Sequence, residues 1–352
     1  MRGRMGLWAS GAVCASASLA SLGANAAVQN EVFKGKTITI EVAGTAGGGI
    51  DIGARLLAPF LHKNLPGRPS VVVQEMPGAG GVRALEYLAS SAPKDGTTIA
   101  AFAAGPLLAP LLGPQKVDYP IDAFTAIGAT DSDNGFCTTW HTSPVKTLAD
   151  ARKKTVTVAG TGAGSDTDTE PVVLNAVLGT KFKVITGYLG TKETALAVER
   201  KEVDGRCGFG LNSIRATEPK WLKDHKLNFI VQLGLKPNPA KPNVPLALNL
   251  VHSASKKAMI RLMSAPLAIA HPYLGPPGMA PAARAALRKA FIVSLHDPAF
   301  RAQFAKASGG AQPNPTDGAT MQRILVDMQA TPKPVVAKLR ALISPNHIAK
   351  TR

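Results

Sequence analysis

One pattern constrains the fold of this chain more than any other. An apolar run rich in β-branched residues, a glycine-rich turn and a helical pattern follow one another repeatedly, at 37–65, 70–89 and 155–178 and more weakly at 182–202. Strands that alternate with helices predict an α/β fold with a largely parallel sheet. In such sheets ligands bind beyond the carboxyl ends of the strands, which is where the glycine turns would lie.

The first repeat shows the pattern most clearly. A strand is expected at 37–42 and a turn at 44–49, followed by a helix at 50–65 whose apolar residues recur every four positions. Pro59 falls inside this helix, where it removes a hydrogen bond and kinks the helix or costs about 3 kcal/mol.

The third repeat predicts a later helix start. Pro171 suits a first helical turn, so the helix is expected over 171–178 with its cap among residues 167–170. Ser165 with Asp168, and Thr167 with Glu170, match the spacing of a capping box. The last third of the chain, from Pro281, reads as mostly helical.

Glycine turns before helices suit an anion. The first N–H groups of a helix have no partner within it, and the helix dipole places partial positive charge there. A glycine-rich approach lets a carboxylate, sulfate or phosphate reach that backbone. At any single turn the glycines could simply make a tight connection. Because the design recurs, we favour several helix starts that converge on one anion.

The sequence shows no catalytic, nucleotide-binding or metal-binding motif at these turns. The turn at 44–49 lacks the Gly-Lys-Ser/Thr of a P-loop, and no turn matches the dinucleotide pattern. Ser165 lacks the frame of a hydrolase nucleophile, and the histidines and cysteines lack metal-ligand spacing. Asp51 and Asp168 are interpreted as helix-start residues. The sequence therefore predicts no catalytic residues, no metal, no cofactor and no enzyme.

The N-terminus predicts export. Arg2 and Arg4 precede a small apolar run, and the small residues at 24–26 suit cleavage near Ala26 or Ala27, so 1–27 is interpreted as a signal peptide. A membrane anchor is the alternative. Cys14 would be removed with the signal peptide.

Two cysteines and a basic charge remain open to interpretation. Cys137 and Cys207 either form a disulfide or stay as buried free thiols. The formal net charge is +17, which attracts anions. Nucleic acid is disfavoured as a partner because no zinc spacing, basic helix or aromatic–basic strand signature is present.

The motifs together resemble a family. In order they are AGGGID at 46–51, VVVQEMPGAGG at 71–81, APKDGTTI at 92–99, GYLG at 187–190, EVDG at 202–205 and PNVP at 242–245. With the signal peptide, they resemble the Bug-type periplasmic solute receptors of tripartite tricarboxylate transporters. The resemblance covers essentially the whole mature chain and is most specific in its first hundred residues.

The resemblance implies a two-lobed, Venus-flytrap periplasmic binding protein of type II-like topology with crossing hinge strands. Lobe I would comprise 28–130 plus 236–352, and lobe II would comprise 131–235. A monomer would capture a small carboxylate and deliver it to the integral membrane subunits of the transporter. A ligand-sensing module for a signalling partner, or a periplasmic enzyme acting on a carboxylate, are the alternatives.

The resemblance also implies the ligand-binding residues. In lobe I they are Thr45, Ala46, Gly47, Gly48, Gly49, Asp51, Gly78, Ala79, Gly80 and Gly81. In lobe II they are Thr161, Gly162, Gly164, Ser165, Tyr188 and Asp204. Asp51 would organise its loop rather than meet an anion directly. The chain departs from the family's pattern in two places: Ala43-Gly44-Thr45 replaces a usual Pro-Phe-Pro, and Leu189 replaces a usual lysine.

Overall fold

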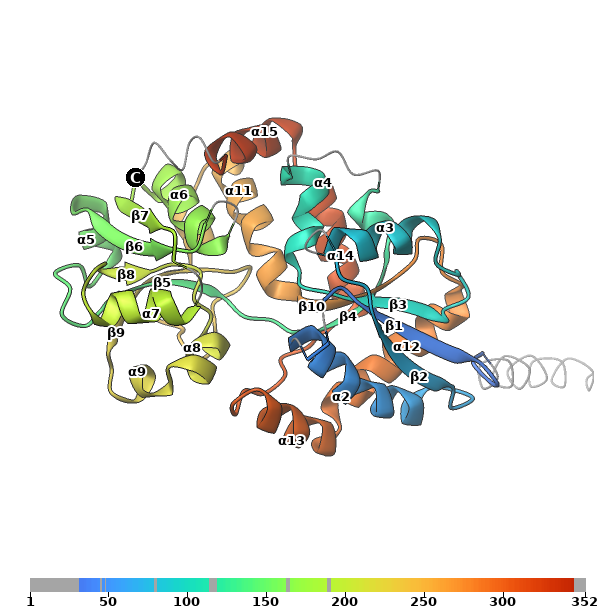
Figure 1. The fold of residues 1–352 in the computed structure, drawn as a ribbon. Helices are drawn as coiled ribbons and strands as arrows, with labels where there is room; N and C mark the ends of the chain where they lie inside the picture. Colours follow the sequence, from blue (N-terminus) through green and yellow to red (C-terminus); the bar gives the residue numbers. More distant parts are fainter. Residues whose placement is uncertain are drawn as a thin grey trace, which may run out of the picture.

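The computed structural model describes residues 32–344, apart from 45, 48, 79, 80, 114–118, 163, 164, 189 and 190. The expected signal peptide and Cys14 lie outside these residues. The described chain forms two sheets with helices around each, which stand side by side in Figure 1. The predicted α/β architecture with two lobes is confirmed.

The first sheet has the strand order β11-β4-β10-β3-β1-β2. Its strands are β1 (Thr37–Val42), β2 (Ser70–Glu75), β3 (Thr98–Ala101), β4 (Thr125–Asp131), β10 (Ala270–Gly275) and β11 (Thr316–Asp317). The predicted parallel pairing holds for β1 with β2 and β3. β10 pairs antiparallel with β3 and β4, and β11 pairs antiparallel with β4, so the sheet is mixed.

The second sheet repeats this design with the order β7-β6-β8-β5-β9. Its strands are β5 (Gly135–Trp140), β6 (Val156–Gly160), β7 (Phe182–Thr186), β8 (Gly205–Arg206) and β9 (Leu227–Leu233). β6 pairs parallel with β7 and β8, and β5 pairs antiparallel with β8 and β9. In each sheet, three neighbouring strands run parallel. The strand beside them runs antiparallel and comes from a distant part of the chain.

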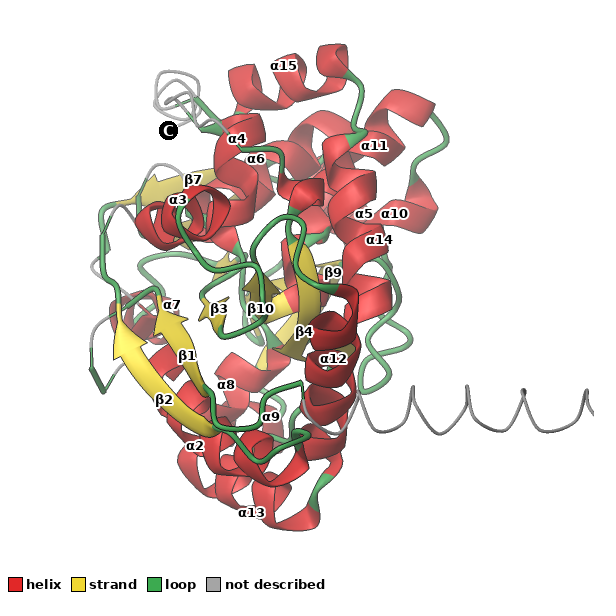
Figure 2. Ribbon diagram, turned by 90° about the vertical axis from the view of Figure 1, so that its right-hand side faces the viewer, coloured by secondary structure: helices red, strands yellow, loops and turns green. Residues whose placement is uncertain are grey.

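Helices cover both faces of the first sheet. One face packs on α2 (Gly49–Asn64), α12 (Pro281–His296) and α13 (Pro298–Ala307). The other packs on α3 (Val82–Ser90), α4 (Ala109–Leu112) and α14 (Gly318–Gln329). Ile38, Ile40 and Val42 alternate along β1 toward the first group. Figure 2 shows α2 and α13 on one side of β1 and β2.

The remaining helices belong mostly to the second sheet. They are α5 (Leu148–Lys153), α6 (Asp166–Leu178), α7 (Thr191–Glu199), α8 (Leu211–Thr217), α9 (Pro219–Lys223), α10 (Ala247–Leu250), α11 (Ala254–Ser264) and α15 (Lys333–Leu342), with 3-10 turns at η2 (Gly105–Leu108), η3 (Ile121–Ala123) and η4 (Pro266–Ile269). Helix α15 contacts α4 as well as α11 and α6, so it bridges the two lobes (Figure 1).

The chain crosses between the sheets twice. It first passes from β4 to β5 through residues 132–134. It returns to the first sheet with β10, after α10 and α11 have packed against α6 and β9. We therefore propose that the second lobe boundary lies near η4 rather than at the expected residue 236.

The two proline expectations have different outcomes. Pro59 lies inside α2 as expected, on an exposed position, and the helix runs on to Asn64. Helix α6 begins at Asp166, so Pro171 lies in its interior and the prediction of a start at 171 is wrong. The amides of Asp168 and Thr169 already bond to the Ser165 carbonyl at 3.2 and 2.9 Å, which starts the helix earlier.

Neither expected capping box forms in this turn. The Ser165 hydroxyl donates to the Gly162 carbonyl at 2.7 Å and caps no helix amide. The Glu170 carboxylate instead accepts from the Gly208 amide at 3.0 Å. Both side chains bind neighbouring loops, which sequence spacing alone does not reveal.

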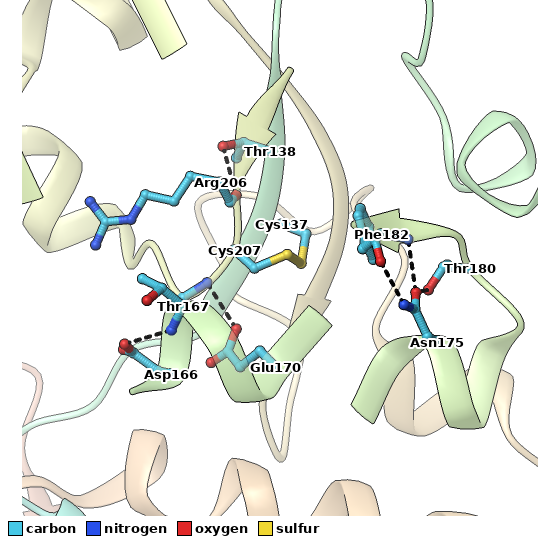
Figure 3. The surroundings of a disulfide bond; sticks show 11 residues. Cys137, Thr138, Asp166, Thr167, Glu170, Asn175, Thr180, Phe182, Arg206 and Cys207 are labelled. Atoms are coloured by element: carbon cyan, nitrogen blue, oxygen red, sulfur yellow. Dashed lines mark hydrogen bonds between the residues drawn. A yellow bond between two sulfur atoms is a disulfide. The ribbon is translucent and has the colours of Figure 1, made fainter. Parts of the chain in front are cut away.

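The two cysteines are paired. A disulfide joins Cys137 in β5 to Cys207 just after β8, and both residues are fully buried (Figure 3). This decides between the two alternatives that the sequence left open. The bond ties β5, the first strand after the chain leaves the first sheet, to the loop that precedes α8.

Loss of this disulfide should lower stability. The bond closes a loop with a sequence separation of 70 residues, and loss of such a bond costs about 2–4 kcal/mol of unfolding free energy. We expect that loss in the double variant Cys137→Ala, Cys207→Ala, measured by urea unfolding. Native protein unfolded with a reductant present should match the variant. An unchanged midpoint in the variant would contradict the prediction.

Candidate functional site

The turns of the first lobe meet at one edge of the sheet. The Ala43 amide donates to the Ala101 carbonyl at 2.9 Å, so the turns after β1 and β3 are adjacent. A Cβ atom at Gly81 would lie 3.4 Å from Ala43 Cβ and 3.0 Å from Pro106 Cγ. The structure thus brings together the turns after β1, β2 and β3, as parallel strands require.

Asp51 holds the first of these turns. Its Oδ2 accepts from the Gly47 amide at 2.8 Å, and its Oδ1 lies 2.8 Å from Arg55 Nε. Arg55 also contacts Glu75. Burial alone would raise the pKa of Asp51, but the Gly47 amide and the Arg55 guanidinium outweigh it and lower the pKa. Asp51 is therefore an ionised residue that already has its partners.

The first turn of the second lobe uses the same device. The Gly162 amide donates to Asp168 Oδ1 at 3.1 Å, and the Thr161 amide donates to Thr167 Oγ1 at 3.0 Å. Asp168 is fully buried. Asp51 and Asp168 are each the third residue of their helix and reach back to the preceding glycine turn.

These contacts correct one premise of the sequence reasoning. An anion was expected to reach the backbone of the glycine turns, but the amides of Gly47, Thr161 and Gly162 are occupied by side chains of the following helices. The glycines give the carboxylate oxygens room to approach, since a Cβ atom at Gly160 would lie 2.2 Å from Asp168 Oδ1. A ligand here would need other donors, such as the first-turn amides of α2.

The structure describes only some of the other predicted residues, and these differ in their exposure to solvent. Ala46, Gly49 and Gly78 are exposed, whereas Gly81 is buried. Thr45, Gly48, Ala79, Gly80 and Gly164 lie outside the described residues.

Tyr188 lies beside the turn that follows β6. Its amide donates to the Gly160 carbonyl at 3.2 Å, and its ring packs against a buried cluster that includes Phe136. Burial and the nearby Glu202 raise the pKa of Tyr188. The structure thus brings the Tyr188 backbone next to residues 161–165.

Asp204 does not join this group. Its Oδ2 accepts from the Thr157 amide at 2.8 Å and from the Thr157 hydroxyl at 2.7 Å. Thr157 stands near the start of β6, whereas residues 161–165 follow its end. The Asp204 carboxylate therefore ties a loop to the opposite end of the strand.

The second lobe's helix starts approach the crossing segment. Asn212, near the start of α8, donates its side-chain amide to Asp131 Oδ2 at 2.9 Å and its backbone amide to Asp133 Oδ2 at 3.0 Å. A Cβ atom at Gly208, just before α8, would lie 3.0 Å from the Thr167 amide nitrogen. The starts of α6 and α8 are thus neighbours, and α8 is fixed to residues 131–133.

The start of α2, in the first lobe, also lies near the crossing segment. The start of α2 shares a cavity with Thr130, the residue before Asp131. The start of α2 therefore borders the same cavity as the end of β4, which leads into residues 131–133 and their contacts with α8. The helix starts of both lobes gather around the first crossing segment.

Sequence reasoning missed a charged cluster beneath α6, which Figure 3 shows around the disulfide. Burial raises the pKa of Glu170 well above its usual value, and the Asp166 charge adds to the rise. Arg206 donates to the Thr194 hydroxyl at 2.9 Å and stacks over the Phe209 ring at 4.3 Å. The only available signal was the acidic run at 166–170, which also reads as a helix start.

The described residues contain neither a metal-ligand cluster nor a helix that could span a membrane. No three His, Cys, Asp or Glu side chains in this part of the chain gather as a metal site would require. Among the same residues, no helix combines the length and hydropathy needed to cross a bilayer.

The fold and the gathered helix starts define a two-lobed binding protein. Residues 54–341 match the tripartite tricarboxylate transporter family receptor (TctC), and this chain belongs to that family. The predicted resemblance is confirmed. Receptors of this family are periplasmic, and they are a class of solute-binding proteins rather than of enzymes.

Individual relatives are distant. The UPF0065 protein in the gbd 5' region of Cupriavidus necator is 40% identical over 90 residues, which cover 26% of this chain and 27% of that relative. A TctC solute-binding protein from Polaromonas is 20% identical, with 86% and 98% of the two chains covered and a TM-score of 0.67. MatC from Rhodopseudomonas palustris with bound malate is 20% identical, with 88% and 99% covered and a TM-score of 0.54. The two structures establish the shared fold.

Asp131 should make stability depend on pH. Burial raises its pKa to about 7, and the Asp133 charge adds to the rise, although Asn212 opposes it. This folded-state pKa lies above the unfolded value of about 3.9. The protonated form therefore stabilises the fold fully below about pH 4, and this contribution is lost as the pH rises through 7.

The test compares the native chain with Asp131→Asn by urea unfolding at pH 5, 6, 7 and 8. The free energy of unfolding of the native chain, relative to the variant, should fall from pH 5 to pH 7 and level off by pH 8. Asp224→Asn, which changes an exposed carboxylate after α9, is the matched control and should show no such trend. Parallel pH profiles for the native chain and Asp131→Asn would contradict the prediction.

Proposed function

We propose that this protein captures a small carboxylate between its two lobes and delivers it to the membrane subunits of a tripartite tricarboxylate-type transporter. The observation that carries the proposal is the gathering of the α2, α6 and α8 starts around residues 130–133. Helix starts from two lobes at one hinge suit an anion that both lobes contact.

The donors in this proposal are the first-turn amides of α2 and the neighbouring exposed turn residues Ala46 and Gly78. Ser165 and Tyr188 would line the opposite side of the ligand, although the carbonyls of Gly162 and Gly160 already accept from their amides. Asp51 and Asp168 would keep the turns in position without touching the anion. Asp204 is left out because Thr157 takes its carboxylate. The malate bound to MatC supports a carboxylate as the ligand class.

The net charge of +17 would favour capture of anions. Salt limits this attraction to about 8 Å under physiological conditions, so the charge assists the encounter rather than the fit. Closure of the lobes would then bring α8 and α6 toward α2 by rotation about the crossing segments. Only the closed form would be presented to the transporter.

The proposed location and state follow from the same function. We propose that residues 1–27 direct export and are then removed, so that the mature chain works as a monomer in the periplasm. Malate and similar acids are small enough to be enclosed by a single two-lobed chain.

A substitution at the start of α2 tests the proposed site. A Cβ atom at Gly49 would meet nothing within 4 Å, so Gly49→Val should fold normally while covering the first-turn amides. A panel of malate, succinate, adipate and benzoate would first be screened by thermal shift, because a bound ligand stabilises the native state. For any acid that binds, calorimetry should show the affinity of Gly49→Val reduced by about tenfold or more.

Ala285→Val, on an exposed position of α12, is the control and should bind like the native chain. Failure of every acid to raise the melting temperature would contradict the proposed function. Normal binding by Gly49→Val would remove α2 from the site.

A further inference from the structure

A cavity of about 210 Å³ lies beside the start of α2. Its lining is mainly apolar and includes Ile50, Ile52, Leu56, Tyr273 and Phe304. An apolar cavity of about 150 Å³ is enough to hold benzene. The space therefore suits a compact apolar group about the size of a benzene ring.

The cavity is open to further apolar contacts. The Ile52 side chain lines it and remains 42% exposed. Gly53 also borders the cavity, and a Cβ atom there would meet nothing within 4 Å. No side chain among the described residues fills the space next to Gly53.

His271 forms part of the wall in an unusual backbone conformation. Its φ is 53°, a left-handed value that non-glycine residues rarely adopt, and Pro272 follows it. A residue before proline normally stays extended. Strain of this kind often accompanies function. The neighbouring segments shield the His271 ring from bulk water and lower its pKa, although part of the residue remains exposed, so the ring that borders the cavity is mostly neutral near pH 7.

We infer that this cavity receives the nonpolar body of the ligand, so that the protein prefers a carboxylate carrying an aromatic ring or a branched chain of about six carbons. The inference rests on the proposed function, since the carboxylate would stay at the first turn of α2. Gly49 and Ile50 border the cavity and also belong to the first turn of α2, so the two places adjoin.

A short dicarboxylate fits this arrangement less well. Its second carboxylate would enter an apolar cavity without a charged partner, and burial of an unpaired charge is strongly unfavourable. The neutral His271 ring supplies at most one hydrogen bond. The cavity therefore discriminates by the polarity of the ligand's far end.

Gly53→Leu tests the inference by filling the cavity from α2. The substitution adds a side chain to open space and replaces glycine in a helix interior, so the fold should be kept. The probes are benzoate and cyclohexanecarboxylate against malate and adipate, measured by calorimetry. We expect the native chain to bind benzoate or cyclohexanecarboxylate more tightly than malate. Gly53→Leu should weaken this binding about tenfold or more and leave malate within about twofold.

A second variant and a control complete the test. His271→Asn keeps a residue that tolerates positive φ and should weaken benzoate binding severalfold, whereas Ala285→Leu on exposed α12 should change nothing. If malate or adipate binds and neither apolar acid does, the inference is overturned and the proposed function stands. Benzoate binding that Gly53→Leu leaves unchanged also overturns the inference. Binding of none of the four acids overturns both.

Discussion

The structure depends on a carboxylate at the third position of a helix that reaches back to the turn before it. Asp51 does this for Gly47 at 2.8 Å and Asp168 does it for Gly162 at 3.1 Å. Each contact satisfies a turn amide, holds the turn against its helix and adds negative charge at the helix start, where the dipole favours it. We propose the first-turn amides of α2 as donors for a ligand, whereas in α6 Asp166 Oδ1 and the Ser165 carbonyl already accept from the amides of Thr167 and Asp168.

Both lobes have this aspartate–turn contact at the end of a similar sheet. The crossing segment connects the two lobes. Asp131 and Asp133 hold the start of α8 through Asn212. Asn134 donates to the buried Gln232 at 2.7 Å, which fixes the crossing segment to β9. The disulfide ties β5 to the loop before α8 within the second lobe. These contacts fix residues 131–134 to the second lobe, so the rotation that we propose would occur where β4 meets these residues and around η4.

Much of the fold could be predicted from local patterns. β1, β2, β6 and β7 were predicted because a buried parallel strand is a short apolar run that a glycine turn ends. β10 and β11 were not, because they pair with strands more than a hundred residues away and carry no local signature. Pro171 misled the assignment of α6, since the bonds to Ser165 that start the helix outweigh one missing N–H.

The site was predictable only in part, for the same physical reason. Asp51 and Asp168 were predicted as helix-start residues from their positions after glycine turns. Asp204 was assigned by resemblance, and its partner Thr157 lies 47 residues earlier in the chain. Asp131 and His271 acquire their properties from burial and from neighbours on distant segments. Such three-dimensional surroundings are not encoded in any short motif.

Hydrogen–deuterium exchange of the whole mature protein, with and without an acid that binds, tests the central claim most directly. The account predicts slower exchange in peptides from both lobes, covering residues 46–53 and 205–213, because one ligand would contact helix starts on each side of the crossing segment. Protection confined to one lobe, or protection only in peptides remote from these helix starts, would contradict it.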